Sequence, residues 1–134
     1  MLNSLKNTIN DMGVEVVIAH GISRDGLYLP ETETIFVRYG LTDEQAKNVI
    51  LHELGHLICK HADTPLSSPY YHSKQESQAD DFWLEELAKE YLNNFDYFPD
   101  YINIYTFLKA YQIGPKYYDK ANAIFTKIGS KELA

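Results

Sequence analysis

The amino-acid sequence predicts an α+β fold, in which a small β-sheet packs on a central helix and further helices follow. Two runs rich in β-branched residues, Val14–Ala19 and Thr34–Tyr39, lie in the first third of the chain and predict strands. From residue 42 onward apolar residues recur at spacings of three and four, which is typical of helices. A chain of 134 residues is long enough for one hydrophobic core, so we expect a single domain over 1–134.

The N-terminal part predicts a short helix followed by strands. Apolar residues recur on one helix face before Gly13, which is a helix stop signal. We expect Val14–Ala19 to be a buried strand because it is almost wholly apolar. The turn signal Arg24-Asp25-Gly26 and Pro30 then interrupt the chain. The expected elements are a helix with Leu2, Leu5 and Ile9 on one face, and strands at Val14–Ala19, Leu27–Leu29 and Thr34–Tyr39.

The central helix has a clear start signal at Thr42. Thr42 and Gln45 have the spacing of a capping box, and Asp43 and Glu44 place negative charge in the first turn. Apolar residues then follow at helical spacing, namely Ala46, Val49, Ile50, Leu54, Leu57 and Ile58.

This helix carries His52-Glu53-Leu54-Gly55-His56, an instance of the H-E-x-x-H pattern. His52 and His56 stand one turn apart on one face, so both imidazoles can reach one ion. Glu53 lies about 100° round the helix from His52 and can reach a water on that ion. The pattern indicates a catalytic zinc site with an open position and a carboxylate base. The alternatives are a chance match on an amphipathic helix and a closed structural zinc site, which is usually rich in Cys.

A site of this kind needs a third protein ligand. The longer pattern H-E-x-x-H-x-x-G-x-x-H does not fit, because Cys59 and Ala62 occupy its Gly and last His positions and His61 is one place off. The best candidate is Glu76, near the start of a second long helix that we expect over Ser73–Leu92.

Glu76 and Asp80 both fall on the apolar stripe of this second helix, where carboxylates are costly unless they pair or bind a metal. We interpret Glu76 as the oxygen ligand and Asp80 as the group that holds the ring N–H of a zinc-bound His. Two alternatives remain: Ser73 and Glu76 also have capping-box spacing, and Asp80 could pair with a Lys or Arg. The stripe consists of Ala79, Trp83, Leu87 and Tyr91.

The HELGH sequence, followed by Glu76-Ser77-Gln78-Ala79-Asp80, resembles the ImmA/IrrE family of metallopeptidases. Members are small bacterial and phage enzymes, often paired with helix-turn-helix repressors that they cleave. The resemblance covers roughly Val14 to Leu92. It implies a zincin-like α+β fold and zinc as the cofactor, with His52, His56 and Glu76 as zinc ligands and Glu53 as the catalytic base.

The resemblance also bears on the substrate. It implies a zinc-dependent endopeptidase that cleaves a cognate repressor, and the alternative is a non-proteolytic anti-repressor that keeps the fold. In zincins the strand before the active-site helix often lies at the sheet edge, so Thr34–Tyr39 would pair with an extended substrate backbone. The alternative is an ordinary inner strand. The chain departs from the family at Phe82–Leu87, where members commonly have a Leu-Leu-Met-Pro-like stretch.

Composition limits the partners and the cellular location that we expect for the protein. The net charge of −7 argues against direct nucleic-acid or anionic-membrane binding, but it would attract a basic DNA-binding domain. The single Cys59 cannot form an internal disulfide. The N-terminal residues lack a signal-peptide layout, and Val14–Ala19 is too short to span a bilayer. We therefore expect a cytoplasmic protein.

The C-terminal third predicts two further helices, over Tyr101–Tyr111 and Tyr117–Ile128, with Gly129 as the stop signal. Seven of the 11 Tyr lie at or beyond Tyr91, which suits either core packing or a protein-recognition surface, with packing favoured.

A peptidase also needs a donor for the tetrahedral oxyanion. Three residues before the Glu76 helix could supply this donor, but we interpret them as ordinary loop residues: Tyr70, Tyr71 and His72.

Overall fold

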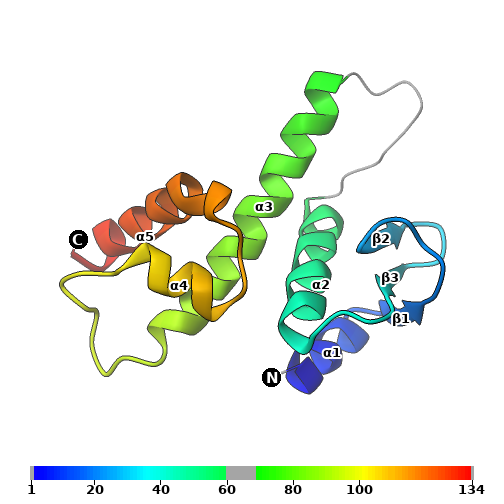
Figure 1. Cartoon of the computed structure of the whole chain (residues 1–134), viewed down its shortest axis with the longest axis horizontal. Helices are drawn as coiled ribbons and strands as arrows, with labels where there is room; N and C mark the ends of the chain where they lie inside the picture. Colours follow the sequence, from blue (N-terminus) through cyan, green and yellow to red (C-terminus); the bar gives the residue numbers. More distant parts are fainter. Residues whose placement is uncertain (1, 60–68, 134) are drawn as a thin grey trace.

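The computed structural model describes residues 2–59 and 69–133, and its two halves lie on either side of a central pair of helices (Figure 1). The sheet and the first helix lie at one end, and the last helices lie at the other. The elements in chain order are α1 (Leu2–Asp11), β1 (Glu15–Ala19), β2 (Gly26–Leu29), β3 (Thr34–Arg38), α2 (Asp43–Ile58), α3 (Pro69–Leu92), α4 (Ile104–Ala110), the 3-10 helix η1 (Pro115–Tyr117) and α5 (Tyr118–Leu133).

The sheet has the strand order β1-β3-β2, so β3 is the inner strand. It pairs in parallel with β1 and antiparallel with β2. The interpretation of Thr34–Tyr39 as an edge strand is therefore wrong, and the inner-strand alternative holds. The expectation of a buried strand at Val14–Ala19 is also wrong. β1 is an edge strand, and its Ile18 is 60% exposed, whereas Ile35 of β3 is fully buried.

The start of α2 is as predicted, and the start of α3 is not. The backbone N–H of Gln45 donates to the Thr42 hydroxyl at 3.1 Å, and the Thr42 N–H donates to the Gln45 side chain at 3.0 Å. This reciprocal pair is the predicted capping box. α3 begins at Pro69, so Ser73 lies inside the helix and does not cap it with Glu76. That alternative account of Glu76 is wrong.

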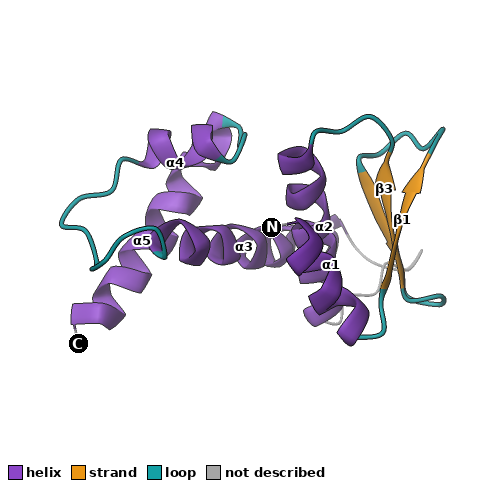
Figure 2. Ribbon diagram, turned by 90° about the horizontal axis from the view of Figure 1, so that it is seen from below, coloured by secondary structure: helices purple, strands orange, loops and turns teal. Residues whose placement is uncertain are grey.

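The helix α2 contributes to two separate hydrophobic clusters. Ile50 and Leu54 pack with Ile35 and Val37 of the sheet and with α1. Leu51 instead joins the cluster formed by α3, α4 and α5, whose members include Leu84, Leu87, Phe107 and Phe125. Because α2 is buried on both sides, it is held rigidly between the two halves, and its remaining face is available for polar groups. Figure 2 shows α2 and α3 between the sheet and the C-terminal helices.

The helices α2 and α3 are in close contact at Gly55 and Ala79. A Cβ atom on Gly55 would lie 3.0 Å from both the Cα and the carbonyl oxygen of Ala79, which is fully buried. Only a residue without a side chain allows this approach. Further along the two helices, the buried Lys47 forms an ion pair with Glu90. The crossing point fixes how the residues one turn away on each helix face one another.

The C-terminal helices differ from the prediction at their ends. α4 is shorter than expected, because Asn103 caps it by accepting a hydrogen bond from the Thr106 N–H at 3.2 Å. α5 runs through Gly129 to Leu133, so the predicted stop at Gly129 is wrong. Gly129 is buried, and a Cβ there would lie 3.3 Å from the Phe98 ring, so this glycine serves packing.

The tyrosines of this part fall into both expected classes. Tyr91 and Tyr111 pack their rings against Phe107 in the core, at centroid distances of 5.4 and 5.3 Å. Three others are exposed, namely Tyr97 at 81%, Tyr101 at 80% and Tyr105 at 64%. Among the described helices, none combines the length and apolar character needed to cross a membrane.

Candidate metal and active site

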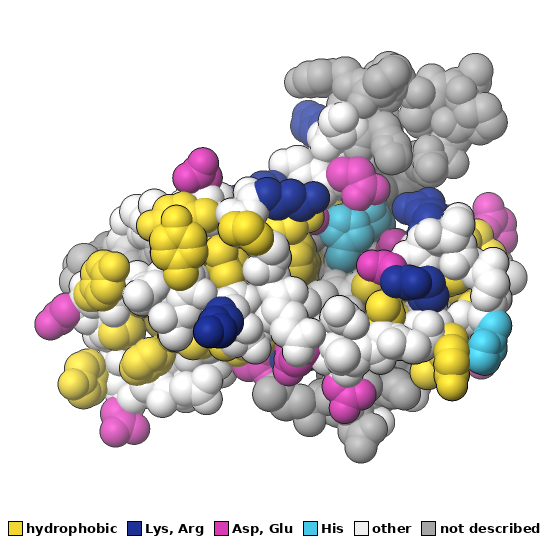
Figure 3. Space-filling model, viewed as in Figure 1, with side chains coloured by type: hydrophobic (Ala, Val, Ile, Leu, Met, Phe, Trp, Pro, Cys, Tyr) yellow, Lys and Arg dark blue, Asp and Glu magenta, His cyan; other side chains and the backbone are white. Residues whose placement is uncertain are grey.

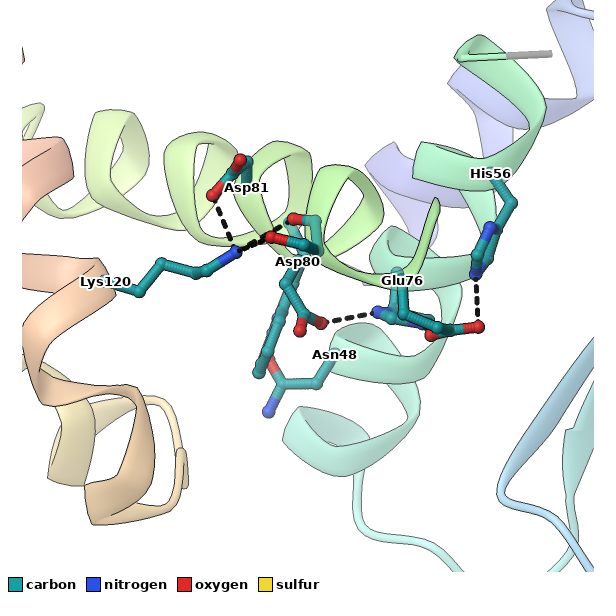
Figure 4. Close-up of polar contacts among 9 residues, drawn as sticks. Asn48, His56, Glu76, Asp80, Asp81 and Lys120 are labelled. Atoms are coloured by element: carbon teal, nitrogen blue, oxygen red, sulfur yellow. Dashed lines mark hydrogen bonds and ion pairs between the residues drawn. The ribbon is translucent and has the colours of Figure 1, made fainter. Parts of the chain in front are cut away.

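The structure brings His52 and His56 of α2 together with Glu76 of α3. The Nε2 atom of His52 lies 2.8 Å from Glu76 Oε2, and the Nε2 atom of His56 lies 3.1 Å from Glu76 Oε1. One ligand atom from each residue lies within 4.8 Å of the other two. Figure 4 shows Glu76 directed from α3 toward His56 on α2. This arrangement depends on the close crossing at Gly55 and Ala79.

The donor set fits a zinc ion. Zinc takes two imidazole nitrogens and a carboxylate oxygen at roughly 2.0–2.2 Å, and a tetrahedral arrangement then separates the ligand atoms by about 3.3 Å. The observed contacts of 2.8 and 3.1 Å run to the two oxygens of Glu76, and one ligand atom from each residue lies within 4.8 Å of the others, so the three groups are close enough to share one ion. Three protein ligands leave one tetrahedral position for water or substrate, which is typical of catalytic sites.

Asp80 holds the other nitrogen of the His52 ring. Its Oδ1 atom lies 2.9 Å from His52 Nδ1, one helical turn beyond Glu76 on α3. This contact fixes the tautomer that leaves Nε2 free to bind an ion. The partner of Asp80 in this contact is His52, and not a Lys or Arg as in the predicted alternative. The nearby cation Lys120 instead pairs with Asp81 at 2.9 Å (Figure 4).

The charges in this cluster shift its protonation. Burial acts to lower the pKa of His52, but hydrogen bonds with Asp80 and Glu76 outweigh burial and raise the pKa to about 9. Hydrogen bonds with His52 and His56 hold the pKa of Glu76 well below its usual range. A proton and a metal ion therefore compete for the same nitrogen of His52.

Glu53 is the most buried carboxylate of the site, with 6% of its surface exposed. Burial raises its pKa, while His52, His56 and Arg24 act in the opposite direction. Its Cγ would lie 3.4 Å from a Cβ on Gly26, at the start of β2. Glu53 is thus wedged between α2 and the sheet, beside the two histidines. A buried carboxylate of raised pKa is suited to accept and return a proton.

These residues line a cavity of about 630 Å³. α2 contributes Asn48, His52 and Glu53, and Glu76 and Asp80 come from α3. The strand side and the C-terminal segment form opposite walls, and in Figure 3 a histidine is visible in a hollow between the two halves. The walls consist of Asp25, Gly26, Arg38, Gly40 and Leu41 on one side and of Gln112, Ile113, Gly114 and Tyr117 on the other.

Several residues considered as candidates from the sequence lie outside the described part of the chain. These are His61 and Ala62, together with the side chains of Tyr70, Tyr71 and His72. Sequence reasoning also missed three residues that shape the site. Gly26 and Gly55 allow close approach of β2 and α3 to α2, and Tyr117 forms part of the far wall. Gly55 had a signal in its place between the two histidines, whereas no motif marks Tyr117.

A small sheet beside an H-E-x-x-H helix, with a carboxylate from a second helix, is the arrangement of zincin-like proteins. The family model described as the IrrE N-terminal-like domain, Peptidase M78, matches residues 9–97, and the chain belongs to this family. The predicted ImmA/IrrE relationship and the α+β, zincin-like fold class are confirmed.

One solved structure with a similar fold is a Mycobacterium tuberculosis transcriptional regulator. It superposes with a TM-score of 0.52 at 22% sequence identity, over 64% of this chain and 35% of the regulator. This chain therefore corresponds to only about a third of that protein. At this identity the likeness concerns the fold alone. A comparison with curated proteins found no match.

Proposed function

We propose that this protein is a zinc-dependent endopeptidase. The observation that carries the proposal is the convergence of His52, His56 and Glu76 within 4.8 Å, with the buried Glu53 beside them. The Peptidase M78 family supports a metallopeptidase-like role. A zinc ion held by these three residues would lower the pKa of a water molecule and polarise a peptide carbonyl.

The other residues of the chain have defined tasks in this proposal. Glu53 accepts the proton of the attacking water and then delivers it to the leaving nitrogen, and burial, which raises the pKa of this carboxylate, favours both transfers. Asp80 keeps the His52 ring in the orientation that presents Nε2. Glu76 closes the ligand set from α3.

The substrate backbone is proposed to lie along β2. Among the described strands, β2 pairs only with β3, so its other edge has no strand partner there. Gly26, the first residue of β2, and the preceding Asp25 line the same cavity as His52 and Glu53. Strand addition would hold a peptide by main-chain hydrogen bonds irrespective of its sequence. In this arrangement β2 takes the place that the sequence analysis gave to Thr34–Tyr39.

A helix-turn-helix repressor is the proposed protein substrate. Two observations support it, beyond the family resemblance. The net charge of −7 favours association with a basic DNA-binding domain, mainly through the rate of encounter. A structural neighbour is a transcriptional regulator, so this fold occurs in regulatory proteins.

The test is co-expression of the chain with helix-turn-helix proteins encoded near it. The parent chain should cut one of them, and Glu53→Gln should bind zinc normally but lower the cleavage rate by about 10²–10⁴-fold, because the proton acceptor is lost. Mass spectrometry of the fragments gives the rate and the cut position. The matched control is Glu86→Gln, a half-buried α3 residue paired with Lys89.

Two results would contradict the proposal. If Glu53→Gln cut as fast as the parent, Glu53 would not be the base. If the repressor lost DNA binding while remaining intact, with either the parent or Glu53→Gln, the protein would act as a non-proteolytic anti-repressor.

A further inference from the structure

Tyr117 lies in the C-terminal wall of the cavity, outside the part of the chain that the family model matches. It is the last residue of η1 and lines the same cavity as His52, Glu53 and Glu76. The family match ends at residue 97, so the presence of a tyrosine here does not follow from family membership. Glu53 is set against the strand wall beside Gly26, so Tyr117 and Glu53 come from opposite sides of the cavity.

Two contacts hold the Tyr117 ring. It packs edge-on against Trp83, with ring centroids 5.1 Å apart. Trp83 is itself held, because its Nε1–H donates to the Asn48 side chain at 3.0 Å and only 7% of its surface is exposed. The ammonium group of Lys116, the preceding residue in η1, lies 5.1 Å from the centre of the Tyr117 ring.

The helix that follows Tyr117 is tied to α3 beside Glu76. Lys120 donates to the Ser77 carbonyl at 2.9 Å and to the Ser77 hydroxyl at 2.8 Å, and it pairs with Asp81. Since Lys120 lies one turn after Tyr117, these contacts hold the tyrosine over the stretch of α3 that carries Glu76 and Asp80. Figure 4 shows Lys120 reaching from α5 to α3 at this point.

The hydroxyl of Tyr117 is a proton donor at neutral pH. Burial raises its pKa, the Asp80 carboxylate raises it further, and Lys116 acts in the opposite direction. A phenol that keeps its proton can donate a hydrogen bond to a negatively charged oxygen without transferring the proton. Tyr117 lines the same cavity as Asp80 and Glu76, and both carboxylates raise the pKa of its hydroxyl.

We propose that the Tyr117 hydroxyl donates a hydrogen bond to the oxygen of the peptide carbonyl under attack, and so stabilises the negative charge that develops there. This proposal rests on the proposed peptidase function. The proton stays on Tyr117 throughout, while Glu53 performs the proton transfers from the opposite wall. The sequence alone assigned no oxyanion donor, because Tyr70, Tyr71 and His72 were interpreted as ordinary loop residues.

The test compares Tyr117→Phe with Tyr118→Phe. The first variant removes the hydroxyl but keeps the ring on Trp83, so the fold should be preserved. The control removes the hydroxyl of the next residue, whose ring packs against Tyr105 at 4.7 Å. The first readout is the dissociation constant of inorganic phosphate, a tetrahedral anion, for each zinc-loaded protein. We expect Tyr117→Phe to weaken phosphate binding by about tenfold, and Tyr118→Phe to leave it unchanged.

The second readout is cleavage of the protein substrate. Tyr117→Phe should lower kcat by about 10²–10³-fold with KM unchanged, because the lost hydrogen bond forms only in the transition state. Unchanged phosphate affinity and kcat in Tyr117→Phe would overturn the proposal, as would an equal loss in Tyr118→Phe.

The outcomes separate this proposal from the proposed function. If the parent cleaves its substrate and Tyr117→Phe cleaves it equally well, only the proposed role of Tyr117 is disproved. A zinc-loaded parent that cleaves nothing removes the peptidase function, and the phosphate measurement then still decides whether Tyr117 binds a tetrahedral anion. A parent that holds no zinc overturns both.

Discussion

Two glutamates of the site have opposite electrostatic environments, although they are chemically identical. Glu76 faces two imidazoles, which hold its pKa well below the usual range. Glu53 is buried against the sheet, and burial raises its pKa. A carboxylate that stays ionised suits a metal ligand, and one that gains a proton more readily suits a base. The local environments therefore distinguish the two assigned roles.

At this scale, Glu76→Ala should abolish stoichiometric zinc binding, because only two of the proposed ligands would remain. The metal content of the purified variant, measured by elemental analysis beside the parent, checks this expectation. Glu85→Ala is the matched control, since Glu85 lies on the same helix and contacts Lys89 at 3.8 Å. Full zinc content in Glu76→Ala would remove Glu76 from the coordination sphere.

Much of the candidate site could be predicted from sequence at the level of single residues, because the chemistry is encoded locally. The spacing of His52 and His56 on one helix is enough to place them together. Glu76 required the additional argument that a carboxylate on an apolar face needs a partner. Tyr117 could not be predicted, because 40 residues separate it from the site on the preceding helix and only the packing of α5 on α3 brings it back.

The crossing of α2 and α3 is the element-level feature on which the site depends. Glu76 lies one turn before Ala79, and His52 and His56 lie on either side of Gly55, so the close contact of the two helices lies beside the three converging ligands. A wider crossing would separate the ligands contributed by the two helices. The glycine of HELGH therefore has a packing function.

Gly55→Ala should destabilise the protein by about 1–3 kcal/mol, because the added methyl group would meet the Ala79 backbone at 3.0 Å. In an unobstructed helix the same change stabilises by about 1 kcal/mol, so the sign of the effect is diagnostic. Urea unfolding measures it. The control Gly114→Ala meets open space at a φ of −65° and should be neutral or slightly stabilising. A stabilised Gly55→Ala variant would contradict the described crossing.

Sequence predicted the helices well and the sheet less well, for a physical reason. The α2 capping box and the apolar stripe of α3 are local signals: α2 begins where expected, and α3 ends at Leu92 as expected although it begins earlier, at Pro69. Strand order depends on pairing between distant segments, and no local pattern showed that β1 would pair with β3 rather than with β2. The burial of β1 was misjudged for the same reason, since an edge strand and an inner strand can share a composition.

The whole molecule places a polar cluster between two hydrophobic cores. α2 belongs to both cores, and the cavity opens between the strand wall and the C-terminal wall. Ionisable groups at this junction couple the protonation of the site to the stability of the fold. The coupling differs with and without a bound metal, because a metal ligand must be deprotonated.

In chelator-treated protein, the contribution of this cluster to the free energy of unfolding should therefore be largest between about pH 4.5 and pH 6.5. The pKa of His52 is raised to about 9, so its contribution is complete below the unfolded pKa of about 6.5 and is lost as the pH rises through 9. The pKa of Glu76 is lowered, so its contribution is present above about 4.5 and is lost as the pH falls.

Thermal unfolding followed by circular dichroism measures this dependence. Saturating zinc should reverse the alkaline trend, since zinc binds the neutral imidazole and stabilises the fold by binding it. Asp80→Asn is the control, because it removes one source of the raised pKa of His52 and should flatten the alkaline loss. A Tm of the chelator-treated parent that stays constant between about pH 6.5 and pH 9 would contradict the described pairing of His52.

Trp83 gives the molecule an optical property that follows from its place in the cavity wall. It is the sole tryptophan of the chain, and its ring stands edge-on to both His52 and Tyr117, at centroid distances of 6.4 and 5.1 Å. When the unlabelled protein is excited at a wavelength that tryptophan absorbs and tyrosine does not, the emission therefore originates at one known point beside the histidines. Spectral changes on adding an ion or a peptide report on that point alone, so occupancy can be followed by titration without attaching a dye.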